Sequence, residues 1–406
     1  MSQRDRILVI GSGLRSYRAY VLEAIRRAGY HVTLITPSAP SWEKELVNEV
    51  IVVNPADVPG ARAAARAAHS LTPFDGVLTY NETTVELAAI LAEDMDLPGP
   101  GVAAARRCRD KLLTRQALRD GGLITPECVV VEERSLGELA RTFPFPAVLK
   151  PRAGYASINI VKLERPEDLR PAWDSVHGDD AAAPDVRREF LLEEYLDGPE
   201  FSLETVVVGG VAFPVCMTDK HKSAEPYFEE VGHQVPAEVP ADEAAAVVGG
   251  AVTALGLAHC VIHPELRKTS RGWAIVEINA RLAGDKIPRL VELATGVELS
   301  RATAEVALGR RMDLAPTRDG SATIGFFVPA EPQVVGRAPS RPPIDGLAEF
   351  EFWAATGEVV APPPERFTTR LGYAIAVGRD GREAERRMRE IIAHVSAETG
   401  LSLVTW

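Results

Sequence analysis

Cysteines are scarce in this chain of 406 residues, and they lie far apart in the sequence. The four thiols, Cys108, Cys128, Cys216 and Cys260, form no CxxC pair, which a structural zinc site would use. Their spacing also gives no disulfide framework of the kind that stabilises small secreted domains. The sequence therefore predicts ordinary buried thiols.

An excess of basic residues is also lacking. The chain has 45 lysines and arginines against 57 aspartates and glutamates, which gives a formal net charge of -12. Extended contact with nucleic acid or with an anionic membrane needs clustered lysine and arginine, so neither partner is expected. A small-molecule partner is favoured, since a local basic pocket can form inside an acidic protein.

Long apolar runs are missing as well. No stretch of about 18 uninterrupted apolar residues occurs, so no helix that spans a membrane is expected. The first residues, MSQRDRILVIGSG, carry charge and a strand pattern instead of the apolar core of a leader, which favours a cytoplasmic protein. With 46% hydrophobic and 25% charged residues, the chain is expected to form two or three globular domains.

The stretch GSGLRS lacks the third glycine of a dinucleotide-binding turn, because Ser16 stands in its place. The second apolar run ends in LITP, without the acid that binds a ribose, so a nicotinamide site is not expected. Two interpretations of the turn remain open. It only joins a strand to a helix, or the helix N-terminus holds part of an anionic substrate. Signatures of nucleophilic catalysis such as G-x-S-x-G are absent too.

Apolar runs and amphipathic segments alternate along the first hundred residues. The run RILVI is followed by the amphipathic segment 15–28 and the run HVTLIT, and further strands are expected in 47–55 and 74–82. This order predicts a parallel sheet with covering helices. The fold class is therefore α/β, with α+β regions further along the chain.

Five regions follow from these patterns. Residues 1–105 are predicted to form an N-terminal α/β domain, 106–124 a linking helix, and 125–190 a small α+β lobe. Residues 191–310 are expected to form a strand-rich lobe, and 311–406 an α+β region that ends in a charged helix.

Polar and apolar side chains alternate in the stretch GWAIVEINAR. A period of two places Glu277, Asn279 and Arg281 on one face of a strand. The run CVIHPELRK before it would form a hairpin that brings Glu265 beside Glu277, provided that the loop has an odd number of residues. Two carboxylates and an amide oxygen are the ligands that Mg²⁺ or Mn²⁺ prefers. The alternative is the solvated face of an edge strand, which Pro264 would fit.

Two lysines form another group of candidates. Lys150 ends the apolar run in VLKP, and the loop after it has the small residues Ala153, Gly154 and Ser157, which permit backbone N–H groups to approach a phosphate. Lys111 begins a helix and is either a second cation of the same site or a surface lysine.

The stretch FLLEEYLDGPEFSLE combines an apolar strand with an acidic turn. Glu193 and Glu194 interrupt the strand, and Asp197, Gly198 and Pro199 turn the chain. Backbone groups near Leu196 would be free to bond a flat heterocycle, and Glu200 would accept hydrogen bonds from hydroxyls. Taken alone, the segment is more typical of a simple hairpin turn.

The order of these motifs resembles the ATP-grasp superfamily. The motifs are DK at Asp110 and Lys111, VLKP at Lys150, EEYLDGPE, HPEL at Glu265, and EINAR. Within the superfamily, the chain is similar to the carboxylate–amine ligases that include the bacterial L-amino acid ligases, which make dipeptides. The resemblance covers nearly the whole chain. It implies a Rossmann-like N-terminal domain, a lid lobe, a catalytic lobe and a C-terminal α+β region.

The resemblance also implies roles for individual residues. The ATP site would consist of two lysines, the lid loop, the hinge against adenine and the ribose acceptor: Lys111, Lys150, Ala153, Gly154, Ser157, Glu193, Glu194, Leu196 and Glu200. Two Mg²⁺ or Mn²⁺ ions that bridge the phosphates would be held by Glu265, Glu277 and Asn279. Arg281 would stabilise the transferring phosphoryl group.

The reaction that the resemblance implies joins a carboxylic acid to an amine. The acid attacks the γ-phosphate to give an acylphosphate, and the amine then displaces phosphate to form an amide. His233 would orient a carboxylate or accept a proton, or it is a loop histidine without chemistry. Further substrate-site candidates are Glu229, Arg267, Gly284 and Asp285. A homodimer is expected.

Three alternatives remain open at this point. The chain could be an ATP-grasp enzyme of the purine-biosynthesis type that uses formate or bicarbonate, or a ligase that acts on a carrier protein. It could also be a nucleotide-binding module without catalysis, although the complete set of acidic and basic motif residues argues against that.

Overall fold

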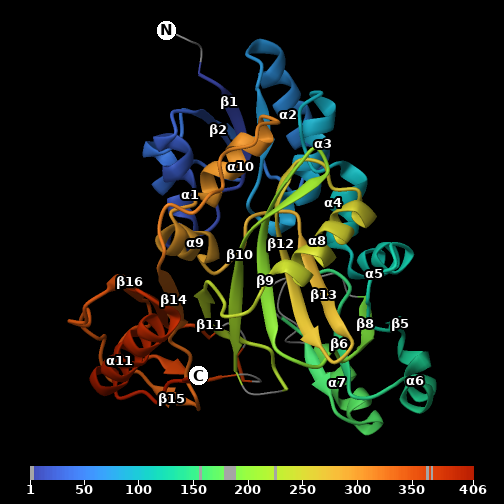
Figure 1. Ribbon diagram of the computed structural model, residues 1–406, viewed down its shortest axis with the longest axis vertical. Helices are drawn as coiled ribbons and strands as arrows, with labels where there is room; N and C mark the ends of the chain where they lie inside the picture. Colours follow the sequence, from blue (N-terminus) through green and yellow to red (C-terminus); the bar gives the residue numbers. More distant parts are fainter. Residues whose placement is uncertain (1–3, 155–157, 178–188, 224–225, 363–364, 367–368) are drawn as a thin grey trace.

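The computed structural model describes residues 4–154, 158–177, 189–223, 226–362, 365–366 and 369–406 (Figure 1). The N-terminal domain is a four-stranded parallel sheet in the order β3-β2-β1-β4, as predicted. Its elements are β1 (Arg6–Ile10), α1 (Arg15–Arg27), β2 (His31–Thr36), β3 (Glu49–Val52), α2 (Val58–Leu71), β4 (Gly76–Leu78) and α3 (Val85–Asp94). The chain adds β2 and β3 on one side of β1 and then places β4 on the other, so the strand order reverses between β1 and β4.

Two helices, not one, link this domain to the next. They are α4 (Val102–Arg109) and α5 (Lys111–Asp120). The break falls at Asp110, whose backbone is extended and whose carboxylate accepts hydrogen bonds from the N–H groups of Leu112 and Leu113. An N-terminal cap of this kind begins a new helix, so Lys111 stands at the first position of α5.

The lobe of 125–190 contains an antiparallel sheet in the order β5-β8-β6-β7. Its elements are β5 (Cys128–Val131), α6 (Leu136–Thr142), β6 (Ala147–Pro151), β7 (Val161–Leu163), α7 (Leu169–Val176) and β8 (Phe190–Glu194). The helices cover one face, where Trp173 packs edge-on against Phe190. In Figure 1 this lobe lies beneath the ends of the longest strands.

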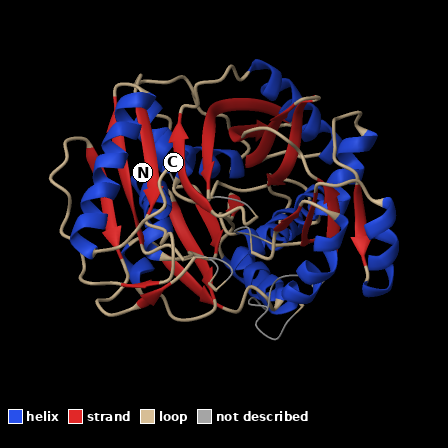
Figure 2. Cartoon of the chain, turned by 90° about the horizontal axis from the view of Figure 1, so that it is seen from below, coloured by secondary structure: helices blue, strands red, loops and turns tan. Residues whose placement is uncertain are grey.

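The largest sheet has eight antiparallel strands in the order β13-β12-β9-β10-β11-β14-β18-β16 (Figure 2). The strands are β9 (Glu200–Val208), β10 (Val211–Lys222), β11 (Glu230–Val235), β12 (Cys260–Thr269), β13 (Gly272–Asn279), β14 (Ser321–Phe326), β16 (Leu347–Phe352) and β18 (Gly372–Gly378). Strands from 311–406 therefore extend the same sheet as those from 191–310.

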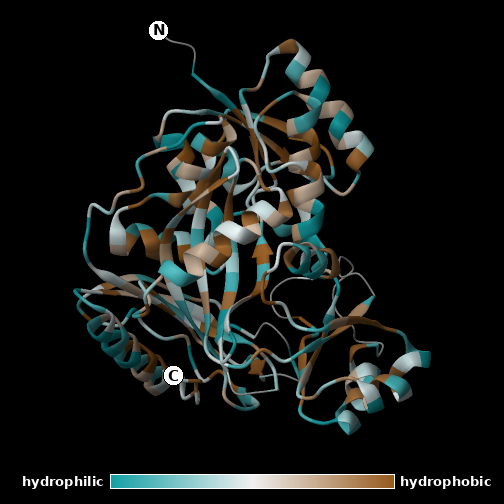
Figure 3. Ribbon diagram, turned by 45° about the vertical axis from the view of Figure 1, so that its right-hand side comes forward, coloured by the Kyte–Doolittle hydropathy of each residue, from teal (hydrophilic) through white to brown (hydrophobic). Residues whose placement is uncertain are grey.

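The remaining helices cover this sheet, and short elements complete the chain. The helices are α8 (Asp242–Leu255), α9 (Ile287–Thr295), α10 (Leu299–Ala307) and α11 (Gly381–Thr399). The short strand β15 (Gln333–Val334) pairs with β17 (Val359–Val360). The 3-10 turns are η1 (Trp42–Glu45), η2 (Glu82–Thr84), η3 (Glu133–Ser135) and η4 (Pro166–Asp168). Figure 3 shows hydrophobic colour along the strands and alternating colours around the helices, as expected for helices with one buried face. The largest hydrophobic cluster joins β1 and β2 to the central sheet through α9 and α10.

The hairpin of β12 and β13 places Glu265 directly opposite Glu277, as predicted, but by another route. The turn has two residues, Ser270 and Arg271, so the prediction of an odd loop is wrong. A β-bulge supplies the missing residue, because Leu266 pairs with Ile275 while Glu265 pairs with Glu277. The extra residue is Val276.

The bulge also changes which side chains share a face. Trp273 and Ile275 lie in the same hydrophobic cluster as Ile278 and Ala280, so the strict alternation expected for this strand is wrong. The extra residue shifts the alternation by one position and leaves Glu277 and Asn279 on the polar side. Pro264 does not mark an edge, because β12 lies between β13 and β9 and the edge strand is β13.

The prediction of buried thiols holds for three of the four cysteines. Cys108, Cys216 and Cys260 are buried free thiols, and Cys128 is half-buried. Among the described residues, no helix combines the length and the apolar character that crossing a lipid bilayer requires.

Trp406 packs against the sheet through the imidazole of His221, with ring centroids 5.3 Å apart. Burial, together with the nearby charges of His233 and Arg389, lowers the pKa of His221 to about 4. In the unfolded chain a histidine titrates near pH 6.5. Between about pH 4 and pH 6.5 the unfolded state therefore binds a proton at this histidine, and the folded state does not. Stability is therefore expected to be full above about pH 6.5 and to fall as the pH drops toward 4, by up to about 3 kcal/mol.

Urea unfolding of the wild type and of His221→Gln between pH 4 and 7 tests this expectation. The variant should show a shallower loss of unfolding free energy at acid pH. The matched control is His177→Gln. His177 also stacks on a tryptophan, but this histidine is exposed. Equal acid sensitivity of the wild type and His221→Gln would show that this imidazole does not set the pH response.

Candidate functional site

A deep cavity of about 1010 Å³, including its open mouth, is lined by the lobe of 125–190 and the strands β10 to β13. It is lined by most of the residues that the sequence singled out: Lys111, Lys150, Gly154, Glu193, Glu194, Leu196, Glu200, Glu265, Arg267, Glu277, Asn279 and Arg281. These residues come from five separate stretches of the chain. The fold therefore gathers the motifs into one site.

One buried carboxylate anchors the lobe side of this cavity. Glu193 on β8 accepts two hydrogen bonds from Arg115, at 3.0 and 3.1 Å, and lies 2.6 Å from the Nζ atom of Lys150. Burial alone would raise the pKa of Glu193, but the charges of Arg115 and Lys150 lower it to about 2. Burial lowers the pKa of Lys150, and Glu193 opposes that shift. The carboxylate is thus held in its charged form between two cations.

Glu200 begins β9 beneath the acidic turn. Lys222 lies 2.6 Å from its Oε2 atom, and the Nε atom of Arg267 donates to the same oxygen at 3.1 Å. Burial raises the pKa of this carboxyl, but the neighbouring lysines lower it to about 2. Its other oxygen, Oε1, is buried without a hydrogen-bond partner among the described residues. An acceptor in this state is ready for a ligand hydroxyl.

The turn after β8 differs from expectation in one respect. The carbonyl of Leu196, which was expected to be free, accepts a hydrogen bond from Arg267 at 2.7 Å. The guanidinium of Arg267 also lies 5.0 Å from the ring centroid of Tyr195. Arg267 therefore fixes the shape of the turn.

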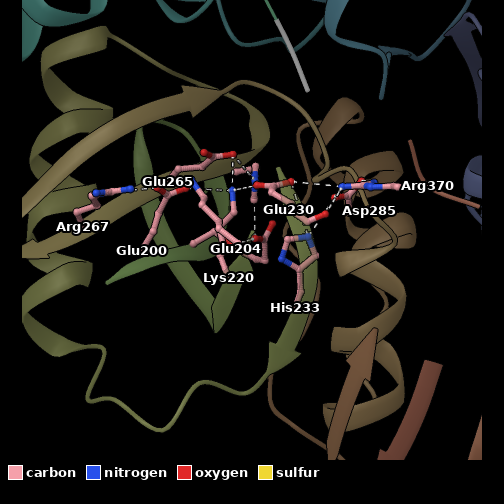
Figure 4. Close-up of polar contacts among 12 residues, drawn as sticks. Glu200, Glu204, Lys220, Glu230, His233, Glu265, Arg267, Asp285 and Arg370 are labelled. Atoms are coloured by element: carbon pink, nitrogen blue, oxygen red, sulfur yellow. Dashed lines mark hydrogen bonds and ion pairs between the residues drawn. The ribbon is translucent and has the colours of Figure 1, made fainter. Parts of the chain in front are cut away.

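Lys220 on β10 forms the centre of a buried acidic group (Figure 4). Its Nζ atom lies 2.5 Å from Glu230, 2.9 Å from Glu265 and 3.6 Å from Glu200. Burial would lower the pKa of this lysine, but the three carboxylates raise it well above its usual value. The ammonium thus balances three negative charges that would otherwise repel one another.

The Nε2 atom of His263 lies 3.2 Å from the carboxylate of Glu265, and the Nδ1 atom of His263 lies 2.8 Å from Glu204. Although burial opposes it, the charge of Lys220 and the hydrogen bond of His263 hold the pKa of Glu265 well below its usual value. On the next strand, Glu277 lies 2.8 Å from the Nζ atom of Lys111. Both carboxylates are therefore oriented by cations.

The metal-binding chemistry predicted for this strand pair fits the donors that are present. Glu265 and Glu277 are directly opposed, and Asn279 follows on the same strand, so all three offer oxygen atoms to the same cavity. Carboxylate and amide oxygens of this kind suit Mg²⁺ or Mn²⁺.

Arg281 links the cavity to the N-terminal domain. Its Nε atom donates to Glu82 at 2.6 Å, and Glu82 also pairs with Arg109. Burial raises the pKa of Glu82, but the charges of Arg281 and Arg109 lower it below its usual value. Glu82 begins the turn η2 after β4, so the parallel sheet helps to aim the guanidinium at the cavity.

Two family models match this chain. The model described as ATP-grasp N-terminal domain matches residues 22–99, and the model described as ATP-grasp domain matches residues 143–289. Together they cover more than half of the 406 residues. The chain belongs to the ATP-grasp family. The predicted fold and the prediction of an ATP-dependent, ADP-forming ligase are confirmed at the level of this family, whose fold binds ATP with Mg²⁺.

Relatives of this ATP-grasp chain include amino acid ligases. It is 26% identical to human carnosine synthase 1, over 78% of this chain and 41% of that protein. It is 28% identical to alanine–anticapsin ligase of Bacillus subtilis, over 59% of this chain and 55% of that protein. The chain thus spans only about half or less of these two relatives. A crystal structure of L-amino acid ligase from Bacillus licheniformis superimposes with a TM-score of 0.80 at 23% identity, over 97% of this chain and 98% of that one.

Several predicted residues of this ATP-grasp chain lie beside the cavity or outside the described part. Ala153 is buried next to Gly154 but does not line the cavity, and Ser157 lies outside the described residues. Glu229 accepts a hydrogen bond from the backbone of Thr369 at 3.2 Å, and burial raises its pKa. Its neighbour Glu230 lines the cavity instead.

His233 and Asp285 form a second polar group with a residue that the sequence did not suggest (Figure 4). Asp285 lies 3.1 Å from His233 and is held by both terminal nitrogens of Arg370, at 2.6 and 2.7 Å. Although burial opposes it, Arg370 and His233 hold the pKa of Asp285 well below its usual value. Gly284, the residue before Asp285, would meet nothing within 4 Å if it carried a Cβ atom.

Sequence reasoning missed Lys220, Glu82, Arg115 and Arg370. Lys220 and Lys222 stand two residues apart on one strand, which is a pattern that could have been read from TDKHK. Glu82, Arg115 and Arg370 reach the site only through tertiary contacts with residues that are 75 or more positions away in the sequence. No local pattern marks residues of that kind.

Proposed function

We propose that this protein is an ATP-dependent ligase that activates a small carboxylic acid, such as an amino acid, as its acylphosphate and joins it to an amine. The observation that carries the proposal is the opposed pair of Glu265 and Glu277, which lines the same cavity as Lys111, Lys150 and Arg281. The cavity thus offers a metal-binding pair beside several cations. The homodimer expected from the sequence is part of the proposal, and light scattering would measure its mass.

In this proposal, ATP lies between the lobe of 125–190 and the central sheet. Lys150 and Lys111 neutralise its phosphates, and the backbone around Glu194 and Leu196 packs against adenine. Glu200 uses its Oε1 atom, which lies 3.6 Å from Lys220 and has no hydrogen-bond partner among the described residues, for a ribose hydroxyl. Ala153 and Gly154 lie next to the phosphates, and residues 155–157, which follow them, are outside the described residues. Water must be excluded from this site, because an acylphosphate hydrolyses.

The chemistry needs charge neutralisation more than a nucleophilic side chain. An attacking carboxylate and the γ-phosphate are both negative, so positive charge must lie between them. Divalent cations held by Glu265, Glu277 and Asn279 would supply part of that charge as Lewis acids. Arg281, fixed by Glu82, supplies the rest from this chain.

Asp285 is proposed to receive the ammonium form of the amine, because it lies next to the residues that follow Arg281 and remains charged. His233 is fully buried and touches Asp285, so it is proposed as a positioning residue for that carboxylate. Glu230 lies 3.9 Å from Arg370 and connects this group to the cavity.

The test is ADP release measured across a panel of amino acids, with and without hydroxylamine. We expect that at least one acid stimulates ADP release, that hydroxylamine traps its acylphosphate as a hydroxamate, and that amines replace hydroxylamine as acceptors. Chelation of divalent cations should abolish all three signals. ATP turnover that yields neither hydroxamate nor amide with any acid would refute the proposal.

A further inference from the structure

The carboxyl ends of β1 and β4 lie where the strand order of the N-terminal sheet reverses, and this place is called the switch point below. Open parallel sheets bind ligands at such points. The helix α1 starts there, and the Nη1 atom of Arg18 on this helix donates to the carbonyl of Ala283 at 2.9 Å. In Figure 1, α1 accordingly lies beside the segment that leads into α9. Arg18 therefore connects the switch point to the residues that directly follow Arg281.

The guanidinium of Arg18 carries a charge that no described carboxylate pairs with. In the described part of the chain, no acid lies within ion-pair distance of this guanidinium. The carboxylate of Asp285 acts on it electrostatically from further away, and Asp285 is already paired with Arg370 and His233. Burial lowers the pKa of Arg18, and the charge of Arg281 lowers it as well. Arg18 is half-buried, so its charge is partly removed from water without a counter-ion, and a bound anion would relieve that cost.

Two tyrosine hydroxyls next to Arg18 lack acceptors. The Oη atoms of Tyr20 and Tyr80 are buried, and no group within the described residues accepts a hydrogen bond from either hydroxyl, although Arg18 itself acts on Tyr20 as a donor. The guanidinium of Arg18 lies 5.7 Å from the ring centroid of Tyr80, which is fully buried, and its charge acts on the hydroxyl of Tyr20. Burial raises the pKa of both phenols, so both remain protonated and able to donate. Unsatisfied buried donors are rare in folded proteins, so both hydroxyls need an acceptor that the described residues do not supply.

We propose that Arg18, Tyr20 and Tyr80 bind a second carboxylate of the substrate, so that the acid which the enzyme activates is a dicarboxylic acid. The group bound here is a second one because Arg281 lines the nucleotide cavity and Arg18 does not. One carboxylate then reacts near Arg281, and the other is held by Arg18, Tyr20 and Tyr80 at the switch point. A guanidinium with two hydroxyl donors and no acceptor suits a carboxylate well. This inference rests on the proposed ligase function.

The test compares matched acids in the ADP-release assay and in thermal unfolding with a non-hydrolysable ATP analogue present. The pairs are glutamate with glutamine, aspartate with asparagine, and succinate with succinamate. In the wild type, the diacid of at least one pair should have a KM at least tenfold below that of its monoamide. Arg18→Met should raise that KM at least tenfold and change the KM and kcat of the monoamide by less than twofold.

Two further variants sharpen the result. Tyr80→Phe removes a hydroxyl that has no partner, so the melting temperature of the free protein should not fall, while the stabilisation by the diacid should shrink. Arg15→Met removes an exposed arginine one turn earlier on α1 and should behave as the wild type does. Arg18→Lys keeps the charge and should retain part of the preference, which guards against a folding defect in Arg18→Met.

The outcomes separate this inference from the proposed function. Equal binding of diacids and monoamides by the wild type, or equal weakening of both by Arg18→Met, would overturn the second-carboxylate site. If no acid stimulates ADP release, the ligase proposal fails. The changes in melting temperature then test the carboxylate site by themselves. A stabilisation by a diacid that Arg18→Met abolishes supports the site, and the lack of any stabilisation refutes it.

Discussion

Replacing Glu277 with glutamine should lower ATP-dependent turnover by at least about a thousandfold, which corresponds to about 4 kcal/mol of transition-state stabilisation. Glutamine keeps the size of the side chain but removes the negative charge that faces Glu265 across the hairpin. It also leaves Lys111, now 2.8 Å from the carboxylate, without its partner. In the proposed mechanism, the divalent cations would then lose a charged ligand. Initial rates of ADP release over a wide range of Mg²⁺ concentration measure the effect.

A matched control separates loss of chemistry from loss of fold. Glu292→Gln removes a carboxylate that is paired with Arg289 at 2.8 Å on α9, outside the cavity, and its turnover should change by less than twofold. Both variants should show the circular dichroism spectrum of the wild type. Near-normal turnover by Glu277→Gln at saturating Mg²⁺ would refute the proposal that Glu277 is a metal ligand, and this conclusion does not depend on the role of Glu265.

The sequence predicted the fold and the members of the site better than it predicted their geometry. Five different short motifs in a fixed order contain most of the predicted residues that line the cavity, and each motif can be recognised because it is local. The register of the hairpin could not be predicted in the same way. A single inserted residue, Val276, replaces the odd loop and preserves the pairing of Glu265 with Glu277. Bulges depend on what contacts the strand, which the strand's own pattern does not record.

Arg115 shows why such a contact is invisible in the sequence. Its guanidinium donates to the carbonyls of Ile275 and Val276, at 3.1 and 2.6 Å, while it also holds Glu193. The carbonyls at the bulge are thus satisfied from a helix that lies 160 positions earlier in the chain. An arginine on an amphipathic helix normally predicts a solvated face, so its burial is a tertiary effect.

The turn GSGLRS could be interpreted only in part for the same reason. Gly11 and Gly13 both have positive φ, 71° and 72°, which glycine adopts without strain, and this agrees with a tight turn. Whether the turn also serves an anion depends on Arg18, Tyr80 and Ala283, which come from three separate regions. The sequence left two interpretations open, and the unpaired guanidinium favours the second of them.

Replacing Glu193 with glutamine should destabilise the protein by about 3–5 kcal/mol, because one buried anion balances two buried cations. Without it, Arg115 and Lys150 have no counter-charge, and three contacts of the carboxylate are lost or weakened. Burial already lowers the pKa of Lys150, so this lysine should become neutral in the variant. Urea unfolding at pH 7 without nucleotide measures the loss.

The pH dependence gives an independent measure of the same carboxylate. Burial would raise the pKa of Glu193, but its two cations lower it to about 2, below the unfolded value near 4.3. Its contribution should be complete above about pH 4.3 and should disappear as the pH falls toward 2, and Glu193→Gln should lack that component. The neighbouring variant Glu194→Gln breaks only a half-exposed pair with Arg271 and should cost less than about 1 kcal/mol. Adding Lys150→Met to Glu193→Gln should restore part of the stability, since it removes the buried amine that has lost its counter-charge. If the double variant is less stable than the single one, the loss comes from packing and not from charge.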